Sequence, residues 1–129
     1  MTVAIACIGL LGLLLFGLGL AVSLTRGRTD TAAGYSSDPS DRLHKLVRAH
    51  GNTTEYAAIL AVLMLVAASR SPSTLALWWM GIATASRYLL AAGILLSATL
   101  EKAHPLRFIG ALGTYVAGIG LSTAVLRSL

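Results

Sequence analysis

RAHGNTTEY, residues Arg48 to Tyr56, leads into a run of sequence that is otherwise apolar enough to cross a membrane. Within it Arg48, Asn52 and Glu55 are spaced at i, i+4 and i+7, so on a helix they lie on one face. A charged side chain inside a bilayer is costly unless it is paired or faces a polar cavity. The stretch therefore predicts a helix that carries a polar stripe, and a group inside the protein that receives it.

The composition around this stretch indicates an integral membrane protein. Of the 129 residues, 56% are hydrophobic and only 12% are charged, whereas a soluble domain carries about 25% charged residues. A chain of this length can supply roughly four helices of about 20 residues each, so we expect a single membrane domain over residues 1–129. The sequence pI of about 10.0 reflects basic residues beside apolar spans. Such placement favours orientation and lipid contact over nucleic-acid binding.

Four apolar runs are separated by polar segments. They cover approximately residues 3–24, 43–68, 74–100 and 106–126. The first run has no basic residue before it and Arg26 and Arg28 after it, the opposite of a cleavable signal peptide, so we expect a retained span. Asp41 or Ser40 is the expected N-cap of the second helix, and Pro105 suits the first turn of the fourth. The predicted fold is an all-α bundle of four transmembrane helices.

The distribution of basic residues predicts the orientation of the helices. Those that flank the first and third loops are Arg26, Arg28, Arg42, Lys45, Arg48, Lys102 and Arg107. Only Arg70 and Arg127 lie on the other side. Because basic residues accumulate in cytoplasmic loops, we expect these two loops inside the cell and both termini outside the cytoplasm.

Glu55 and Arg87 are predicted to lie at similar depths in the bundle. Glu55 lies about nine residues from the expected cytoplasmic end of its helix, or about 14 Å, and Arg87 about thirteen residues from the end of the third run, or about 20 Å. The second and third helices are antiparallel, and a long arginine side chain can bridge a difference of about one turn. We therefore predict that Glu55 and Arg87 form an ion pair inside the bundle, since either alone would be costly.

This pair has a structural and a functional interpretation. As a structural ion pair it would fix the register of two helices. As part of a binding site it would be joined by Arg48, Asn52 and Arg107. A cluster of arginines suits an anionic ligand, because guanidinium groups bind carboxylates bidentately. Arg48 and Arg107 can also be explained as interfacial anchors whose stems snorkel to the membrane surface.

Other polar and small residues carry less information. His44, His50 and His104 lack metal-ligand spacing with cysteine or acidic residues, so no metal is expected and a surface position is favoured for each. His50 should point away from the polar stripe, and Cys7 is expected as a small buried hydrophobe. Small residues favour close helix packing. They are Gly9, Gly12, Gly17 and Gly19 in the first run, and Gly93, Gly110, Gly113, Ala117 and Gly120 in the last two.

Three motifs together resemble the MAPEG family, the membrane-associated proteins in eicosanoid and glutathione metabolism. RAHGNTTEY, from Arg48 to Tyr56, is similar to the family's R-x-x-x-N-x-x-E-Y signature on the second helix. SRYLLAAG, from Ser86 to Gly93, is similar to the R-x-x-H-A-x-G stretch of small bacterial members, and PLRFIG, from Pro105 to Gly110, to their P-x-R-x-x-G. The length, the four spans and the polar first loop also match, so the resemblance covers nearly the whole chain.

The resemblance implies a homotrimer of four-helix subunits in a bacterial inner membrane, with glutathione bound between neighbouring subunits and open to the cytoplasm. By motif position, the residues that would bind glutathione are Arg48, Asn52, Glu55, Tyr56 and Arg87. Arg107 would be catalytic, because the family links an arginine at this position to the glutathione thiolate, and a nearby cation lowers the pKa of a thiol. The implied activity is that of a glutathione transferase or peroxidase, in which the thiolate attacks an apolar electrophile or a lipid hydroperoxide from the bilayer.

Two residues depart from the family pattern and leave alternative functions open. Leu90 stands where small bacterial members often carry histidine, and Ile94 where several eukaryotic enzymes have tyrosine. A non-catalytic membrane scaffold that binds a lipid or thiol is therefore the second interpretation. A small four-helix exporter is the third and is disfavoured. Such exporters typically carry their key glutamate in the first helix, and the first run here has no charged residue.

Overall fold

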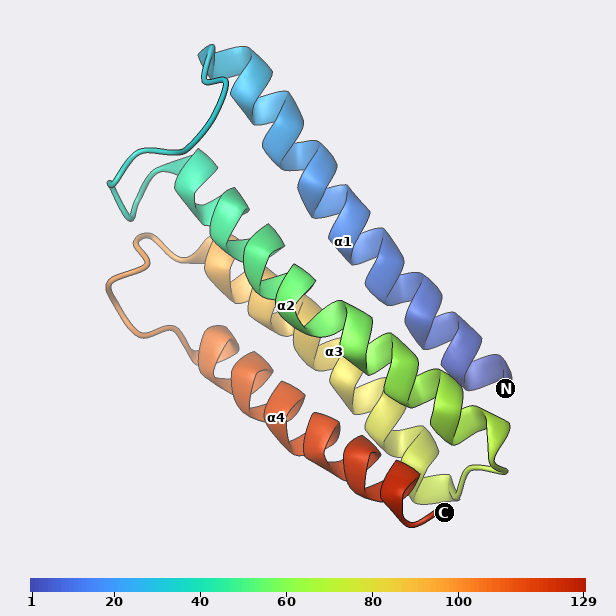
Figure 1. Cartoon of the computed structure of the whole chain (residues 1–129). Coiled ribbons are helices and arrows are strands. Elements are labelled where there is room, and N and C mark those ends of the chain that lie inside the picture. The colour runs from blue at the N-terminus through green and yellow to red at the C-terminus, as the bar shows by residue number, and fades with distance from the viewer.

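The computed structural model describes all 129 residues and contains four long helices. α1 covers Thr2–Thr29, α2 Arg42–Ser69, α3 Thr74–Leu96 and α4 Pro105–Leu126. They form an antiparallel bundle in which both termini lie at one end, here called the terminal end (Figure 1). The α1–α2 and α3–α4 loops lie at the other, the loop end. The predicted number and order of helices are confirmed.

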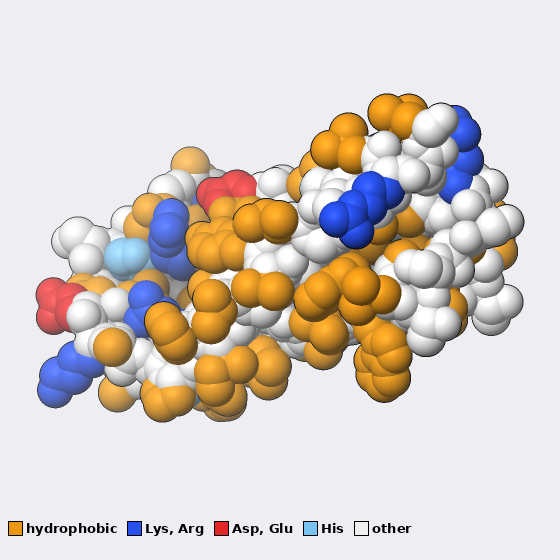
Figure 2. All heavy atoms as spheres, turned by 90° about the horizontal axis from the view of Figure 1, so that it is seen from below, with side chains coloured by type: hydrophobic (Ala, Val, Ile, Leu, Met, Phe, Trp, Pro, Cys, Tyr) orange, Lys and Arg blue, Asp and Glu red, His pale blue; other side chains and the backbone are white.

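All four helices are long and apolar enough to span a membrane. Large apolar side chains are exposed along them, among them Phe16 at 77% and Phe108 at 70%. Figure 2 shows one face on which apolar side chains fill the middle and charged side chains lie toward the ends. A soluble protein rarely exposes so much contiguous apolar surface to water. The chain is therefore an integral membrane protein.

The starts of α2 and α4 follow the predicted signals. Asp41 caps α2, because its carboxylate accepts a hydrogen bond from the His44 amide at 2.9 Å. Pro105 occupies the first turn of α4, where its missing N–H does no harm because that group would have no partner in the helix. Each of these two helices begins one residue before its predicted boundary.

The end of α1 differs from the prediction. The helix continues to Thr29 rather than stopping at Leu24, and Asp30 closes it in the left-handed conformation with φ of 51°. Hydropathy marks where the chain leaves the hydrocarbon layer, but the helical hydrogen bonds continue beyond that point. Arg26 and Arg28 lie in the last turn, where positive charge suits the negative end of the helix.

The end of α3 also differs, and this difference affects the site. The helix stops at Leu96 rather than at Leu100 because Ser97 adopts an extended backbone conformation. The Ser97 hydroxyl donates to a carbonyl of the preceding turn, and Lys45 of α2 donates to the Ser97 carbonyl at 3.0 Å. Arg87 is therefore about nine residues, or about 14 Å, from the end of its helix, roughly one turn nearer the loop end than predicted.

The largest cluster of the core lies in the half of the bundle near the termini and draws on all four helices. Its largest fully buried apolar side chains are Leu11, Met64, Met80 and Leu121, one from each helix. Cys7 is buried among them, as predicted. Packing at this end fixes the helices relative to one another, so the loop-end half can tolerate more polar side chains.

Small residues bring α3 and α4 into close contact, as predicted. A Cβ atom at Gly110 would lie 2.5 Å from the Leu90 backbone nitrogen, and one at Gly93 would lie 2.6 Å from the Arg107 nitrogen. The first helix differs, because most of its glycines meet no neighbour within this chain. Those with nothing within 4 Å of an added Cβ are Gly9, Gly12, Gly17 and Gly27.

Replacing Gly110 by alanine is expected to destabilise the bundle by about 1–3 kcal/mol, because the added methyl group meets rigid α3 backbone. Gly118→Ala is the matched control on the same helix, since its Cβ would meet only the Leu60 Cδ2 atom at 3.9 Å. Thermal unfolding of the two variants in the same detergent measures the difference. Equal midpoints would contradict the close α3–α4 contact.

Candidate functional site

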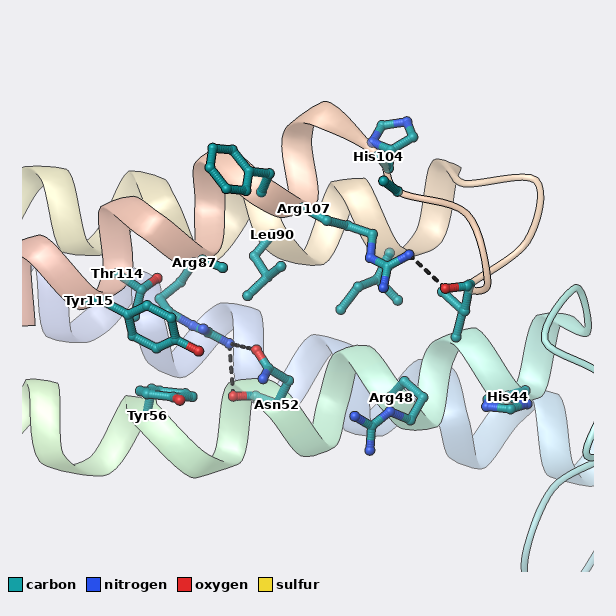
Figure 3. A pocket seen from close by; sticks show the side chains of 15 residues that line it. His44, Arg48, Asn52, Tyr56, Arg87, Leu90, His104, Arg107, Thr114 and Tyr115 are labelled. Atoms are coloured by element: carbon teal, nitrogen blue, oxygen red, sulfur yellow. Dashed lines mark hydrogen bonds between the residues drawn. The ribbon is translucent and has the colours of Figure 1, made fainter.

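A groove of about 550 Å³ opens between α2 and α4 in the loop-end half of the bundle, with α3 as its floor (Figure 3). We call it the cationic groove. Its polar lining residues are His44, Arg48, Asn52, Tyr56, Arg87, His104, Arg107, Thr114 and Tyr115. Its apolar lining residues are Leu90, Ile94, Leu100, Ala103, Phe108 and Ala111. Three arginines and no carboxylate line it, so the groove is suited to an anion.

Arg87 lies on the floor of the cationic groove and is only 1% exposed. Its Nη2 atom donates to the Asn52 backbone oxygen at 2.8 Å and to the Asn52 Oδ1 atom at 2.7 Å. Its guanidinium carbon lies 5.0 Å from the centre of the Tyr56 ring, a distance typical of a cation–π contact. The Nε and Nη1 atoms are buried without a partner. Unpaired buried donors are rare in proteins, so this cation is incompletely compensated by the chain.

The predicted Glu55–Arg87 ion pair is not formed, because Asn52 takes the place of the carboxylate. The side chain of Glu55 is exposed on α2 and does not line the groove. Its only hydrogen bond is a long one of 3.5 Å, accepted from the Asn52 side-chain amide. Asn52 thus stands between the two charges, with its oxygen toward Arg87 and its nitrogen toward Glu55.

Helix geometry explains why Glu55 misses the groove. One residue turns about 100° around the helix, so a step of four advances about 40° and a step of three falls back about 60°. The face of α2 that lines the groove is therefore Arg48, Asn52 and Tyr56, at i, i+4 and i+8. Glu55 lies about 100° from Tyr56 and projects past the groove toward the outer surface of the chain.

Arg107 extends from the first turn of α4 toward α2 (Figure 3). Its Nη1 atom donates to the carbonyls of Leu100 and Lys102 at 3.0 and 3.1 Å. These bonds fix the arginine against the α3–α4 loop and leave its Nε and Nη2 atoms free for a ligand. Gly93 allows this position, because the Arg107 backbone passes where a Cβ would otherwise be.

Two histidines toward the loop end of the groove were not predicted to line it (Figure 3). His44, expected on the surface, lines it, and its Nδ1 atom lies 3.0 Å from the Asp38 carbonyl oxygen. The side-chain and backbone hydrogen bonds from Ser40 lower the pKa of the exposed Asp38 carboxyl in the same loop. His104, at the N-cap of α4, also lines the groove, and its Nδ1 atom is buried without a partner.

Tyr115 closes the inner end of the groove, with its ring centre 6.0 Å from that of Tyr56. Its spacing of i+8 from Arg107 places both on one face of α4, a signal that was present in the sequence. His50 points away from the polar stripe, as predicted, but it is partly buried against α1 rather than on the surface, and a Cβ at Gly19 would lie 3.1 Å from its Nε2 atom.

These features define a four-helix membrane protein with a buried arginine on the floor of a cationic groove. A sequence model of the MAPEG family matches residues 4–127. The chain therefore belongs to the MAPEG family, as its motifs predicted, and is a membrane protein related to glutathione metabolism. No curated protein and no solved structure matches the chain. The two departures from the family pattern, Leu90 and Ile94, both lie in the cationic groove itself.

Proposed function

We propose that the cationic groove binds glutathione. The observation that carries this proposal is Arg87, a guanidinium group that is 1% exposed and has two nitrogens without partners. Glutathione has two carboxylates, and carboxylates are the natural bidentate partners of guanidinium groups. Arg48 and Arg107 add positive charge along the same groove, so a ligand with more than one negative group fits better than a single anion. A volume of about 550 Å³ is within the range of small-molecule sites.

Arg107 is the proposed catalytic residue. It would hold the sulfur of glutathione beside its free Nε and Nη2 atoms and stabilise the thiolate, the nucleophilic form. The thiol proton passes to water. In the transferase reaction the sulfur forms a bond to the electrophilic carbon and the leaving group departs with its electron pair. In the peroxidase reaction the sulfur attacks a hydroperoxide oxygen, the O–O bond breaks to give an alcohol and a sulfenic acid, and a second glutathione reduces that acid to the disulfide and water.

The apolar electrophile would enter from the lipid side of the groove. A second, mostly apolar groove of about 320 Å³ shares Tyr56, Thr114 and Tyr115 with the cationic groove and continues along α2 and α4. This continuity supports a water-poor approach for an apolar molecule or lipid. Leu90 and Ile94 supply no proton donor, which keeps a glutathione-binding scaffold without turnover as the second candidate function.

We also propose that the protein assembles as a homotrimer, so that a neighbouring subunit covers the cationic groove. Glu55 is exposed on a membrane-spanning helix without a basic partner in its own chain, and such a carboxylate requires a partner from outside. Gly9, Gly12 and Gly17 are open on α1, and small residues allow helices of different subunits to approach closely. Glu55, which lies outside the cationic groove of its own chain, would then bind the ammonium group of a glutathione molecule held between two subunits.

The proposed orientation places the loop end in the cytoplasm of a bacterial cell, with both termini outside the inner membrane. The support is the excess of Lys and Arg beside the α1–α2 and α3–α4 loops, which is typical of cytoplasmic loops. The cytoplasm is also where glutathione keeps thiols reduced. The cationic groove would therefore open toward its ligand.

Glutathione is expected to raise the unfolding midpoint of the purified full-length protein in detergent. A ligand at a hundred times its Kd stabilises the folded state by about 2.7 kcal/mol. S-methylglutathione, which keeps both carboxylates but cannot form a thiolate, should still stabilise the protein, whereas the single amino acid glycine should not. No shift with millimolar glutathione would contradict the proposed ligand. A dimer rather than a trimer in native mass spectrometry would contradict the proposed assembly.

A further inference from the structure

A second polar groove, of about 560 Å³, lies at the terminal end of the bundle. We call it the terminal groove. The α2–α3 turn and the first turns of α3 form one side of it, and the last turns of α4 form the other. It shares no lining residue with the cationic groove, so the proposed glutathione site does not account for it.

Two arginines from distant parts of the chain line the terminal groove. Arg70 follows the last residue of α2, and Arg127 follows the last residue of α4. Both side chains are exposed and form no ion pair or side-chain hydrogen bond within the chain. All five acidic residues lie elsewhere, four in the loops of the loop end and one, Glu55, within α2. Figure 2 accordingly shows basic side chains without acidic neighbours at this end of the molecule.

Unused hydrogen-bond donors accompany these charges. The Ser71 hydroxyl has no partner, and the Ser73 hydroxyl accepts from the Ala76 amide at 3.2 Å, which leaves its own proton free to donate. The start of α3, a helix of 23 residues, faces the groove and adds the partial positive charge of a helix N-terminus. The Trp79 indole packs against Gly120 within the groove, and tryptophan is typical of the headgroup level of a bilayer.

We propose that the terminal groove binds the phosphate group of an anionic phospholipid. The ends of the spanning helices mark the level of the lipid headgroups, so a phosphate at this depth is present wherever the protein is embedded. Two guanidinium groups, two hydroxyl donors and a helix N-terminus supply the donors that phosphate oxygens prefer. The acyl chains would lie along the exposed apolar surface of α3, which begins beside the groove with Leu75 and Trp78.

Thermal unfolding of the full-length protein in detergent tests this proposal with added dioleoylphosphatidylglycerol. The variants are Arg70→Gln with Arg127→Gln, and the matched control Arg28→Gln with Arg42→Gln, which removes two exposed arginines at the loop end. We expect phosphatidylglycerol to raise the midpoint of the wild type and of the control. For the terminal-groove variant the apparent affinity should fall by about fivefold for each lost arginine, because each basic residue near an anionic headgroup contributes roughly that factor.

Two comparisons complete the test: one with a lipid that has no net charge, and one with inorganic phosphate as a soluble anion. Dioleoylphosphatidylcholine carries the same acyl chains and a phosphate, but its choline cation cancels the negative charge and is repelled by the two arginines, so it should stabilise all forms weakly and equally. An equal effect of the two lipids, or an equal loss in both arginine variants, would overturn the proposal, since the stabilisation would then not depend on this groove. Inorganic phosphate should have no effect alone. If it reproduced the shift and lost it in the terminal-groove variant, the ligand would be a soluble anion and the lipid assignment would be wrong.

Discussion

Arg87→Met is expected to keep or raise the thermal stability of the ligand-free protein and to remove its response to glutathione. In the wild type a cation is almost wholly buried with two of its nitrogens unpaired, which is unfavourable for folding. Methionine fills a similar elongated space without charge, and replacing buried charges by apolar side chains is often neutral or stabilising. The gain is offset by the loss of the hydrogen bonds to Asn52, whose amide can turn toward the groove.

The same substitution removes the proposed anchor for a glutathione carboxylate. A charge-assisted pair of hydrogen bonds is lost, so the affinity should fall by about a hundredfold. Glutathione titrations monitored by thermal unfolding in detergent measure both effects at once. Arg28→Met, the same chemical change at an exposed position on α1, should leave the response intact, and Arg87→Lys should retain part of it because the charge remains.

Opposite results separate a structural role from a binding role. If Arg87→Met unfolds the protein, Arg87 is a structural residue whose hydrogen bonds to Asn52 hold α2 and α3 together. If the variant is stable and still responds fully to glutathione, the proposed floor of the site is wrong. A stable variant without a response is the result that a ligand-binding arginine predicts.

The spans of the bundle could be predicted because hydropathy and capping act locally. Apolar runs of sufficient length require helices in a bilayer, and Asp41 and Pro105 carry their own start signals. The ends of α1 and α3 could not be predicted in this way. The end of α3 depends on Ser97, whose carbonyl is bonded by Lys45 from another helix, and such a contact leaves no mark in the local sequence.

The candidate site could be predicted only in part, because the local sequence shows which residues share a helix face but not which face points toward another helix. Spacing along α2 correctly grouped Arg48 with Asn52, and the groove also contains the predicted Tyr56, Arg87 and Arg107. The predicted partner of Arg87 was wrong because an estimate of depth does not tell which face of α2 points into the groove: Asn52 lines it and Glu55 does not. A carboxylate is also a stronger partner than an amide when only charge is considered. Only the rotation of α2 in the bundle decides that Asn52, and not Glu55, faces Arg87.

Arg107→Ala is expected to abolish the thiolate form of bound glutathione at neutral pH while the protein remains folded. In the wild type the free guanidinium nitrogens of Arg107 would stabilise the thiolate, so the pKa of the bound thiol should lie below the value of about 8.5 for a free thiol. Without the cation this pKa returns toward or above that value, and the thiolate disappears at pH 7. Turnover with an apolar electrophile should fall by about a hundredfold to a thousandfold, as when one preorganised charge stabiliser is removed.

Ultraviolet absorbance of the thiolate, followed as a function of pH at saturating glutathione, measures this midpoint directly. The substitution also removes the bonds from Arg107 to the carbonyls of Leu100 and Lys102, so the loop could loosen and weaken binding. Lys102→Ala is the matched control, because it removes an exposed cation from the same loop but leaves those carbonyls bonded. Arg107→Lys should restore part of the shift through charge alone. A midpoint in Arg107→Ala equal to that of the wild type, with glutathione still bound, would exclude this arginine from thiolate stabilisation and favour a scaffold that binds glutathione without reacting it.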